Sequence, residues 1–287
     1  EQEYKPDANG DVSFDLGEII RAQLTLPLPL YAGVNPAVVT FGWCRQFYIR
    51  AGEKTGQIYL GIIAGAVYRA IGSGLEWDKF IDFDVDDIHK NGASSYKFAT
   101  WQPREKMIAA AGKDWLYIYN YLTIAFTPIN IQLKADITYQ DGTQLLNQNI
   151  QAAFTSQQHD LIVIPSGPGQ ITLPDPAPTT NPIVEYTLRL WNVDTNLALS
   201  EDFTYIIDRN YYEYNRTFIF KNSVGVYEAV WCHGYEEVSA DITRQSALKH
   251  VPFNYTSTES ESYQFDHTNQ KIYSANTGTK KRAYIEY

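Results

Sequence analysis

The sequence predicts an all-β protein made of tandem Ig-like or fibronectin-like β-sandwich domains with few short helices. Aromatic residues make up 14% of the chain, with 22 Tyr against a single Met, and aromatic side chains favour half-buried pleated surfaces. Short runs that alternate apolar and polar residues also recur along the chain, with polar turns between them and few long helical periods. Strands at such regular spacing are typical of a β-sandwich.

Two consecutive runs in the first half of the chain give the strongest strand patterns. Residues 115–126 are rich in aromatic and β-branched side chains, and residues 129–139 alternate almost strictly before the hairpin turn signal Gln140-Asp141-Gly142. Weaker strand patterns lie at residues 11–16, 38–50 and 57–63, the last two joined by turn-like residues 51–56. Short helices are predicted at residues 17–24 and at 103–111, where Pro103 suits a first helical position.

The second half continues the strand pattern. Residues 183–192 alternate apolar and polar side chains, and residues 218–228 form two aromatic and β-branched runs around an Asn-Ser-Val-Gly turn, which predicts a β-hairpin. Further strands are predicted at residues 201–208 and 263–273, and the last residues, 279–287, resemble the first turns of a truncated helix.

A proline-rich segment, residues 165–182, predicts the domain organisation. It holds six of the 13 prolines of the chain, and proline cannot donate a hydrogen bond to a central strand. We therefore expect one or more N-terminal β-sandwich domains over residues 1–164, a linker over 165–182, and a C-terminal β-rich domain over 183–287.

The charge of the chain restricts its partners. A net charge of −10 and a pI near 5.0 argue against a sequence-independent grip on nucleic acid and against docking on an anionic membrane. The most apolar segment, residues 59–71, is too short to cross a bilayer and contains Arg69. The chain begins at Glu1 and its only Met is Met107, so we expect either a removed signal or tag, or trimmed flanks.

Cys44 and Cys232 are the only cysteines. Free cysteine is usually buried, so two isolated thiols are favoured over a disulfide, although the sequence leaves their pairing open. No G-x-S-x-G, Walker or G-x-G-x-x-G motif occurs. In Trp231-Cys232-His233, neighbouring side chains of a strand would point to opposite faces. We expect no enzyme and no cofactor; a glycan hydrolase is the third-ranked hypothesis, because its carboxylate pair would be set by the fold.

An acidic cluster is the strongest local candidate for a metal site. Asp82, Asp84 and Asp86 alternate with apolar residues in I-D-F-D-V-D-D, and hard cations such as Ca²⁺ bind several carboxylates together. The EF-hand spacing fails, because its glycine would fall on Asp87 and its closing glutamate on Ala93. The cluster therefore favours a strand with its carboxylates in water, and no metal is expected.

An aromatic cluster is the candidate binding surface. Tyr211, Tyr212 and Tyr214, together with Trp77 and Trp101, could stack on sugar rings, because aromatic faces are apolar and their edges offer polar contacts. The competing interpretation is ordinary packing at a strand or strand edge, which the tyrosine-rich composition favours.

Four segments resemble tail-region proteins of phages and prophages of Bacteroidetes. They are residues 12–21, residues 96–104 before the strand at 115, the hairpin at 218–228, and Tyr-Ser-Ala-Asn-Thr-Gly at 273–278. Val226 stands where this pattern has a second Gly, and Ala229 where it has a Thr. The last segment is followed by no Leu-Thr-Lys entry into its helix.

The resemblance implies a structural virion component of a phage tail, at the baseplate or distal fibre region. Such a part would assemble as a homo-oligomer with other tail or baseplate proteins and would contact the host surface, where a glycan is one expected ligand. The alternative hypothesis is an exported bacterial glycan-binding module or adhesin at the cell surface, which would be monomeric and would use its aromatic residues as a stacking platform. Neither hypothesis involves nucleic acid or insertion into a membrane.

Overall fold

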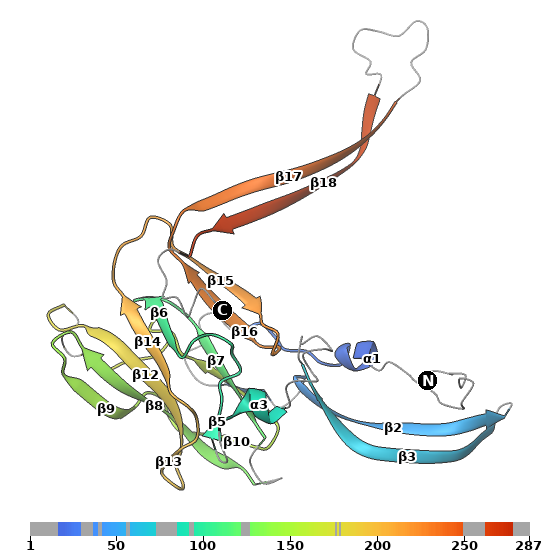
Figure 1. Cartoon of the computed structure of the whole chain (residues 1–287), viewed down its shortest axis with the longest axis horizontal. Coiled ribbons are helices and arrows are strands. Elements are labelled where there is room, and N and C mark those ends of the chain that lie inside the picture. The colour runs from blue at the N-terminus through green and yellow to red at the C-terminus, as the bar shows by residue number, and fades with distance from the viewer. Residues whose placement is uncertain are drawn as a thin grey trace, which may run out of the picture.

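A computed structural model describes residues 17–29, 37–39, 42–55, 58–72, 85–91, 95–121, 127–175, 177, 179–248 and 262–277. These residues form a mostly β protein with two short helices, α1 (Gly17–Arg21) and α3 (Val85–His89). Figure 1 shows a compact body of strands from which two long ribbons project. The all-β prediction is confirmed. Among the described residues, no helix is long and apolar enough to cross a membrane.

The first layer of the body is a seven-stranded sheet. Its main path runs in the order β10 (Phe154–Ser156), β8 (Ile129–Tyr139), β12 (Ile183–Asn192), β14 (Phe203–Asp208), β6 (Glu105–Ala109). Two further strands pair with it, β9 (Gln144–Asn149) with β8 and β13 (Leu197–Ala198) with β12. β14 and β6 are parallel, and the other pairs are antiparallel. β8 buries alternate residues from Ile131 to Tyr139, as its period-two sequence predicts.

The second layer is a three-stranded sheet in the order β1 (Ala37–Val39), β11 (Asp160–Pro165), β7 (Trp115–Asn120). All residues of β7 and β11 are buried. Leu116 and Ile118 face the seven-stranded sheet, whereas Trp115 and Tyr117 belong to a second apolar cluster on the opposite face. A strand covered on both faces carries a continuous apolar run instead of an alternating one.

The third layer covers that opposite face. It consists of the hairpin β15 (Arg216–Lys221) and β16 (Tyr227–Cys232), together with the buried ring of Trp43. Val224 and Val226 of the hairpin turn pack in the same cluster as Trp115 and Tyr117. The hairpin predicted at residues 218–228 is confirmed, and the body is a β-sandwich with an additional layer.

The proline-rich segment does not separate two domains, which corrects the boundary predicted at residues 165–182. β8 lies before the segment and β12 after it, yet the two strands pair over Ile183–Asn192. The start of the segment also packs on the body: Ser166 is fully buried, its carbonyl accepts a hydrogen bond from the Tyr186 hydroxyl at 2.7 Å, and its own hydroxyl lies 2.8 Å from that of Tyr205. The start of the segment is therefore a buried connection within one sandwich, whereas its described residues after Ile171 are half-buried or exposed.

Two further predictions are corrected within the body. Residues 103–111 contain the strand β6 in place of a helix, because Lys106 and Ile108 are buried and the strand pairs with β14. The acidic run ends in the helix α3, not in a strand. The helix predicted near residue 17 is confirmed as α1. The strand predicted at 11–16 and the helix at 279–287 lie outside the described residues.

Two antiparallel ribbons project from the body (Figure 1). The β2–β3 arm pairs β2 (Cys44–Thr55) with β3 (Ile58–Ile71), and the β17–β18 arm pairs β17 (Glu236–Leu248) with β18 (Ser262–Ala275). The turn predicted at residues 51–56 lies mostly inside β2. A short hairpin of β4 (Lys90–Asn91) and β5 (Ser95–Tyr96) completes the described strands.

Candidate functional site

The β2–β3 arm exposes apolar and aromatic side chains on both of its faces. Tyr48 pairs with Val67 across the arm, and Phe47 pairs with Tyr68 in the neighbouring register position. Tyr48 and Val67 are 56% and 59% exposed. The rings of Phe47 and Tyr68 stack with their centroids 5.6 Å apart, and the Arg50 guanidinium lies 4.9 Å from the Tyr48 ring centroid. These side chains cover one another only in part, and their outer surfaces stay in water.

The β17–β18 arm has the same character. Val238 pairs with Tyr273, and both are more than half exposed. Ile242 is exposed on the same face, because it lies four residues from Val238, while Ile272 is exposed opposite Ser239 on the other face. An isolated two-stranded ribbon is at best marginally stable in water. The two arms are therefore the described surfaces that most need a partner.

The root of the β2–β3 arm is anchored in the body by Trp43. Its side chain is 1% exposed, and its ring centroid lies 5.1 Å from that of Tyr119 in β7, a strand of the second layer. Gly42 precedes it with a φ of +98°, and a Cβ there would lie 2.7 Å from the carbonyl oxygen of Thr25. The Gly72 amide closes the arm by donating to the Trp43 carbonyl at 3.0 Å. The arm thus leaves the body from a tightly packed turn.

His89, at the end of α3, is buried beside this root. Its ring centroid lies 5.4 Å from that of Tyr119 and 6.1 Å from that of Trp43. Within the structure neither ring nitrogen has a hydrogen-bond partner. Burial lowers the pKa of His89 from 6.5 to about 4, because the charged imidazolium would lose its hydration.

We therefore expect the protein to lose stability in acid through His89. The folded state holds this ring neutral down to about pH 4, while the unfolded state binds the proton near pH 6.5, so stability is full above pH 6.5 and falls as the pH drops toward 4. The total loss is roughly 3 kcal/mol at 1.36 kcal/mol per pKa unit. Urea unfolding between pH 7 and 4 measures it, and His89→Leu should flatten the curve in this range. An equally steep curve for His89→Leu would show that other groups cause the loss.

The root of the β17–β18 arm is closed by backbone hydrogen bonds between its two ends. The Gly234 amide donates to the Asn276 carbonyl, and the Asn276 amide donates to the Tyr235 carbonyl, both at 2.9 Å. A Cβ on Gly234 would lie 2.8 Å from that of Asn276, so the close approach requires glycine. Arg216 of β15 also forms an ion pair with Glu236, with 2.9 Å between Nε and Oε2. Asn276 lies in residues 273–278, one of the four segments singled out in the sequence.

Two other segments singled out in the sequence, residues 96–104 and 218–228, meet where β15–β16 docks on the body. The Asn222 amide nitrogen donates to Glu228 Oε1 at 2.6 Å and to the carbonyl of Ala99 at 3.1 Å, and its oxygen accepts from the Val226 amide. Gln102 donates to the other oxygen of Glu228 at 3.1 Å. Asn222, Glu228 and Gln102 are all buried. The motif residues thus hold the third layer against the second by a buried polar network.

Removing the Asn222 amide should loosen this junction. Asn222→Ala leaves the buried Glu228 carboxylate without one of its donors, and hydrogen bonds to charged groups contribute about 1.5–3 kcal/mol, so we expect a loss of about 2 kcal/mol. Asn222→Asp should cost more at pH 7, because two carboxylates would then face each other. Thermal unfolding of both variants measures the effect. Equal stability of Asn222→Asp and Asn222→Ala at pH 7 would contradict it.

The structure separates the tyrosines predicted as a binding surface. Tyr211 is 91% exposed. Tyr212 donates to Asp208 Oδ2 at 2.8 Å, and its ring packs on those of Trp231 and His233. Tyr214 instead meets the ring of Tyr235 edge-on. These three tyrosines do not form one flat platform, and two of them support the root of the β17–β18 arm.

The remaining predicted residues are not brought together in a described site. Trp77, Asp82 and Asp84 lie outside the described residues, as does the side chain of Asp86 in α3. Trp101 donates to the Ser223 hydroxyl of the hairpin turn at 2.8 Å. Within the described part of the chain, no group of three or more His, Cys, Asp or Glu side chains could hold a metal ion. The two cysteines are free thiols, Cys232 buried and Cys44 half-buried.

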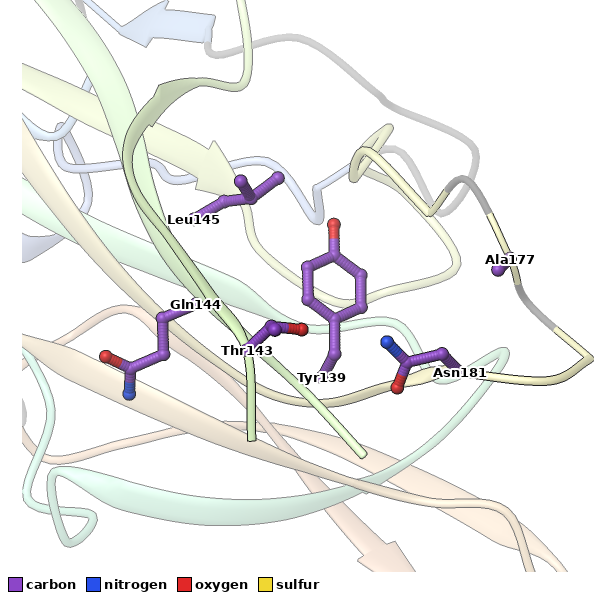
Figure 2. A pocket seen from close by; sticks show the side chains of 6 residues that line it. All are labelled: Tyr139, Thr143, Gln144, Leu145, Ala177 and Asn181. Atoms are coloured by element: carbon purple, nitrogen blue, oxygen red, sulfur yellow. The ribbon is translucent and has the colours of Figure 1, made fainter. Parts of the chain in front are cut away.

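Two open hollows lie on the described surface. The first, of about 170 Å³, is drawn in Figure 2, where the ring of Tyr139 stands between Thr143 and Asn181. The second, of about 370 Å³, has a lining that exposes more polar than apolar surface and contains one ion pair, Asp175 with Arg209 at 3.8 Å. Ligand pockets usually measure 300–1,000 Å³ and bring a few polar groups together on the ligand. The first hollow is too small for such a site, and neither lining contains a histidine or a cysteine.

Sequence patterns alone did not reveal the arms as exposed surfaces. Residues 58–71 are almost continuously apolar, which is typical of a buried strand. The comparisons with known proteins add no family: the chain matches no family model, and no curated protein sequence is significantly similar to it.

Proposed function

We propose that the chain is a structural subunit of a phage tail, in the baseplate or distal fibre region, that assembles with copies of itself and with other tail proteins. The observation that carries the proposal is the pair of long ribbons with apolar side chains on both faces. Exposed strands of this kind pair readily with other chains, and a free two-stranded ribbon is marginally stable. The arms would therefore gain their stability from neighbours in an assembly.

The body supports the same function. An Ig-like sandwich with a third layer would provide a rigid platform, and both arms leave it from roots packed by Trp43 and by Gly234 with Asn276. The segments that resemble tail-region proteins contribute to the docking of β15–β16 and to the root of the β17–β18 arm. Contact with the host surface and a place in the virion belong to this proposal. It includes no catalytic reaction and no cofactor.

The glycan-binding adhesin receives less support from the side chains. Stacking on sugar rings requires aromatic faces that are free and share one surface. Tyr212 and Tyr214 instead pack on separate aromatic neighbours, and Tyr211 alone remains fully exposed.

Quantitative mass spectrometry of density-purified particles from the source culture tests the proposal. The peptide 217–221 is a suitable reporter, because trypsin cleaves after Arg216 and after Lys221. We expect recovery at a fixed ratio to the major tail protein, which would also give the copy number. Absence from the particles, with the peptides in the cell-surface fraction, would contradict the tail function and favour the adhesin.

A further inference from the structure

The two arms carry opposite charges. Residues 44–71 contain four basic side chains and one acidic side chain, a net charge of +3. The strands β17 and β18 contain four acidic and two basic side chains, a net charge of −2. The chain as a whole has a net charge of −10, so the basic β2–β3 arm stands out against an acidic molecule.

The charged groups lie where a partner could reach them. Arg45, Arg50 and Arg69 are exposed on the β2–β3 arm, as are Glu237 and Asp241 on the β17–β18 arm. Exposed charges of opposite sign steer the encounter of two surfaces and fix their register. Each arm also offers apolar surface to bury, from Tyr48 and Val67 on one and from Val238 and Tyr273 on the other.

The lengths of the arms agree as well. β3 and β18 each contain 14 residues, which corresponds to about 46 Å of extended strand at 3.3 Å per residue. Each ribbon also has two outer edges whose backbone groups can pair with an added strand. The arms thus carry opposite charges, contain strands of equal length, and both expose apolar side chains.

We propose that the β2–β3 arm of one copy docks along the β17–β18 arm of a neighbouring copy. This inference rests on the proposed assembly function and specifies its partner, a second copy of this chain. Figure 1 shows the two arms leaving the body in different directions. The two arms of one molecule therefore do not dock on each other. Docking of unlike surfaces is head-to-tail, and such contacts form a ring when the rotation closes and a filament when it does not.

Charge-reversed variants of the full chain test this contact. Arg45→Glu with Arg69→Glu changes the β2–β3 arm from +3 to −1, and Glu237→Lys with Asp241→Lys changes the strands of the other arm from −2 to +2. Light scattering over a concentration series should show wild-type assemblies at multiples of 32.7 kDa. Either double variant alone should associate at least about tenfold more weakly, because like-charged surfaces would then meet.

Mixing and matched controls make the test specific. A 1:1 mixture of the two double variants should associate again, because each supplies the charge that the other lacks. Arg45→Lys with Arg69→Lys keeps the charge and should assemble as the wild type does. All four positions are exposed, so unchanged thermal unfolding confirms that each variant folds.

Two results would overturn the docking of unlike arms. One is a wild-type chain that stays monomeric over the whole concentration series. The other is assembly that both charge reversals leave unchanged, which would place the contact elsewhere. Neither result affects the detection of the chain in purified particles, so a failure of this contact is distinguishable from a failure of the tail function.

Discussion

Asp114→Ala should destabilise the protein by about 3–5 kcal/mol, because it leaves a buried lysine without its counter-ion. The Lys106 ammonium donates to Asp114 Oδ2 at 2.7 Å and also to the carbonyl of Ala229, and both charged side chains are almost completely buried. The Tyr205 hydroxyl donates to the same carboxylate oxygen at 3.0 Å. Urea unfolding of the two proteins measures the difference.

A double variant separates the cost of the unpaired charge from the cost of altered packing. Lys106→Met with Asp114→Asn removes both charges while it keeps a hydrogen-bond acceptor for Tyr205. Replacing both members of a buried ion pair is often close to neutral, so this variant should recover most of the stability that Asp114→Ala loses. If the double variant is as unstable as Asp114→Ala, the buried charge is not the cause.

Trp43→Ala should also cost about 3–5 kcal/mol, the usual range for a fully buried aromatic residue. Its ring fills the third layer between His89 and Tyr119, and no other described side chain occupies that position. The substitution should also loosen the root of the β2–β3 arm, because the Trp43 ring lies beside Gly72 at the end of that arm.

A comparison with an exposed aromatic residue isolates the packing contribution. Tyr211→Ala removes a side chain that is 91% exposed and should change the unfolding free energy by less than about 0.5 kcal/mol. Chemical unfolding of both variants in dilute solution avoids any contribution from assembly. A Trp43→Ala variant with the stability of Tyr211→Ala would contradict the anchoring role of the tryptophan.

The sequence predicted the strands that have one covered face and one open face. β8 and β12 have the bounds of the predicted runs 129–139 and 183–192, because alternation of apolar and polar residues reports directly on a half-buried strand. The hairpin β15–β16 was also predictable, because its Asn-Ser-Val-Gly turn is a local signal. The residues that determine these elements lie within or next to them in the sequence.

Elements that depend on distant partners were mispredicted. The proline-rich segment indicated a linker, but Ser166 is held by Tyr186 and Tyr205 from strands that follow the segment. Pro103 indicated a helix start, yet parallel pairing with β14 makes residues Glu105–Ala109 a strand. In both cases a tertiary contact outweighs the local propensity, and a single sequence does not contain that contact.

The candidate site was the least predictable part. The apolar run of β3 is typical of a strand that is covered on both faces, whereas the structure leaves Val67 and Tyr68 of this strand exposed. The opposite net charges of the two arms can be counted from the sequence. They indicate a contact between arms only once the structure shows that both segments project from one body.

Amide hydrogen exchange of the full chain, compared between dilute and concentrated solutions, tests most directly whether the arms are assembly elements. We expect the amides of β2, β3, β17 and β18 to exchange quickly in the dilute protein and to become protected on assembly, because a lone ribbon opens at little cost in free energy. β7 and β11, buried between two layers, should be protected in both states. Arms that are equally protected at every concentration, or that stay unprotected within the assemblies, would contradict this role.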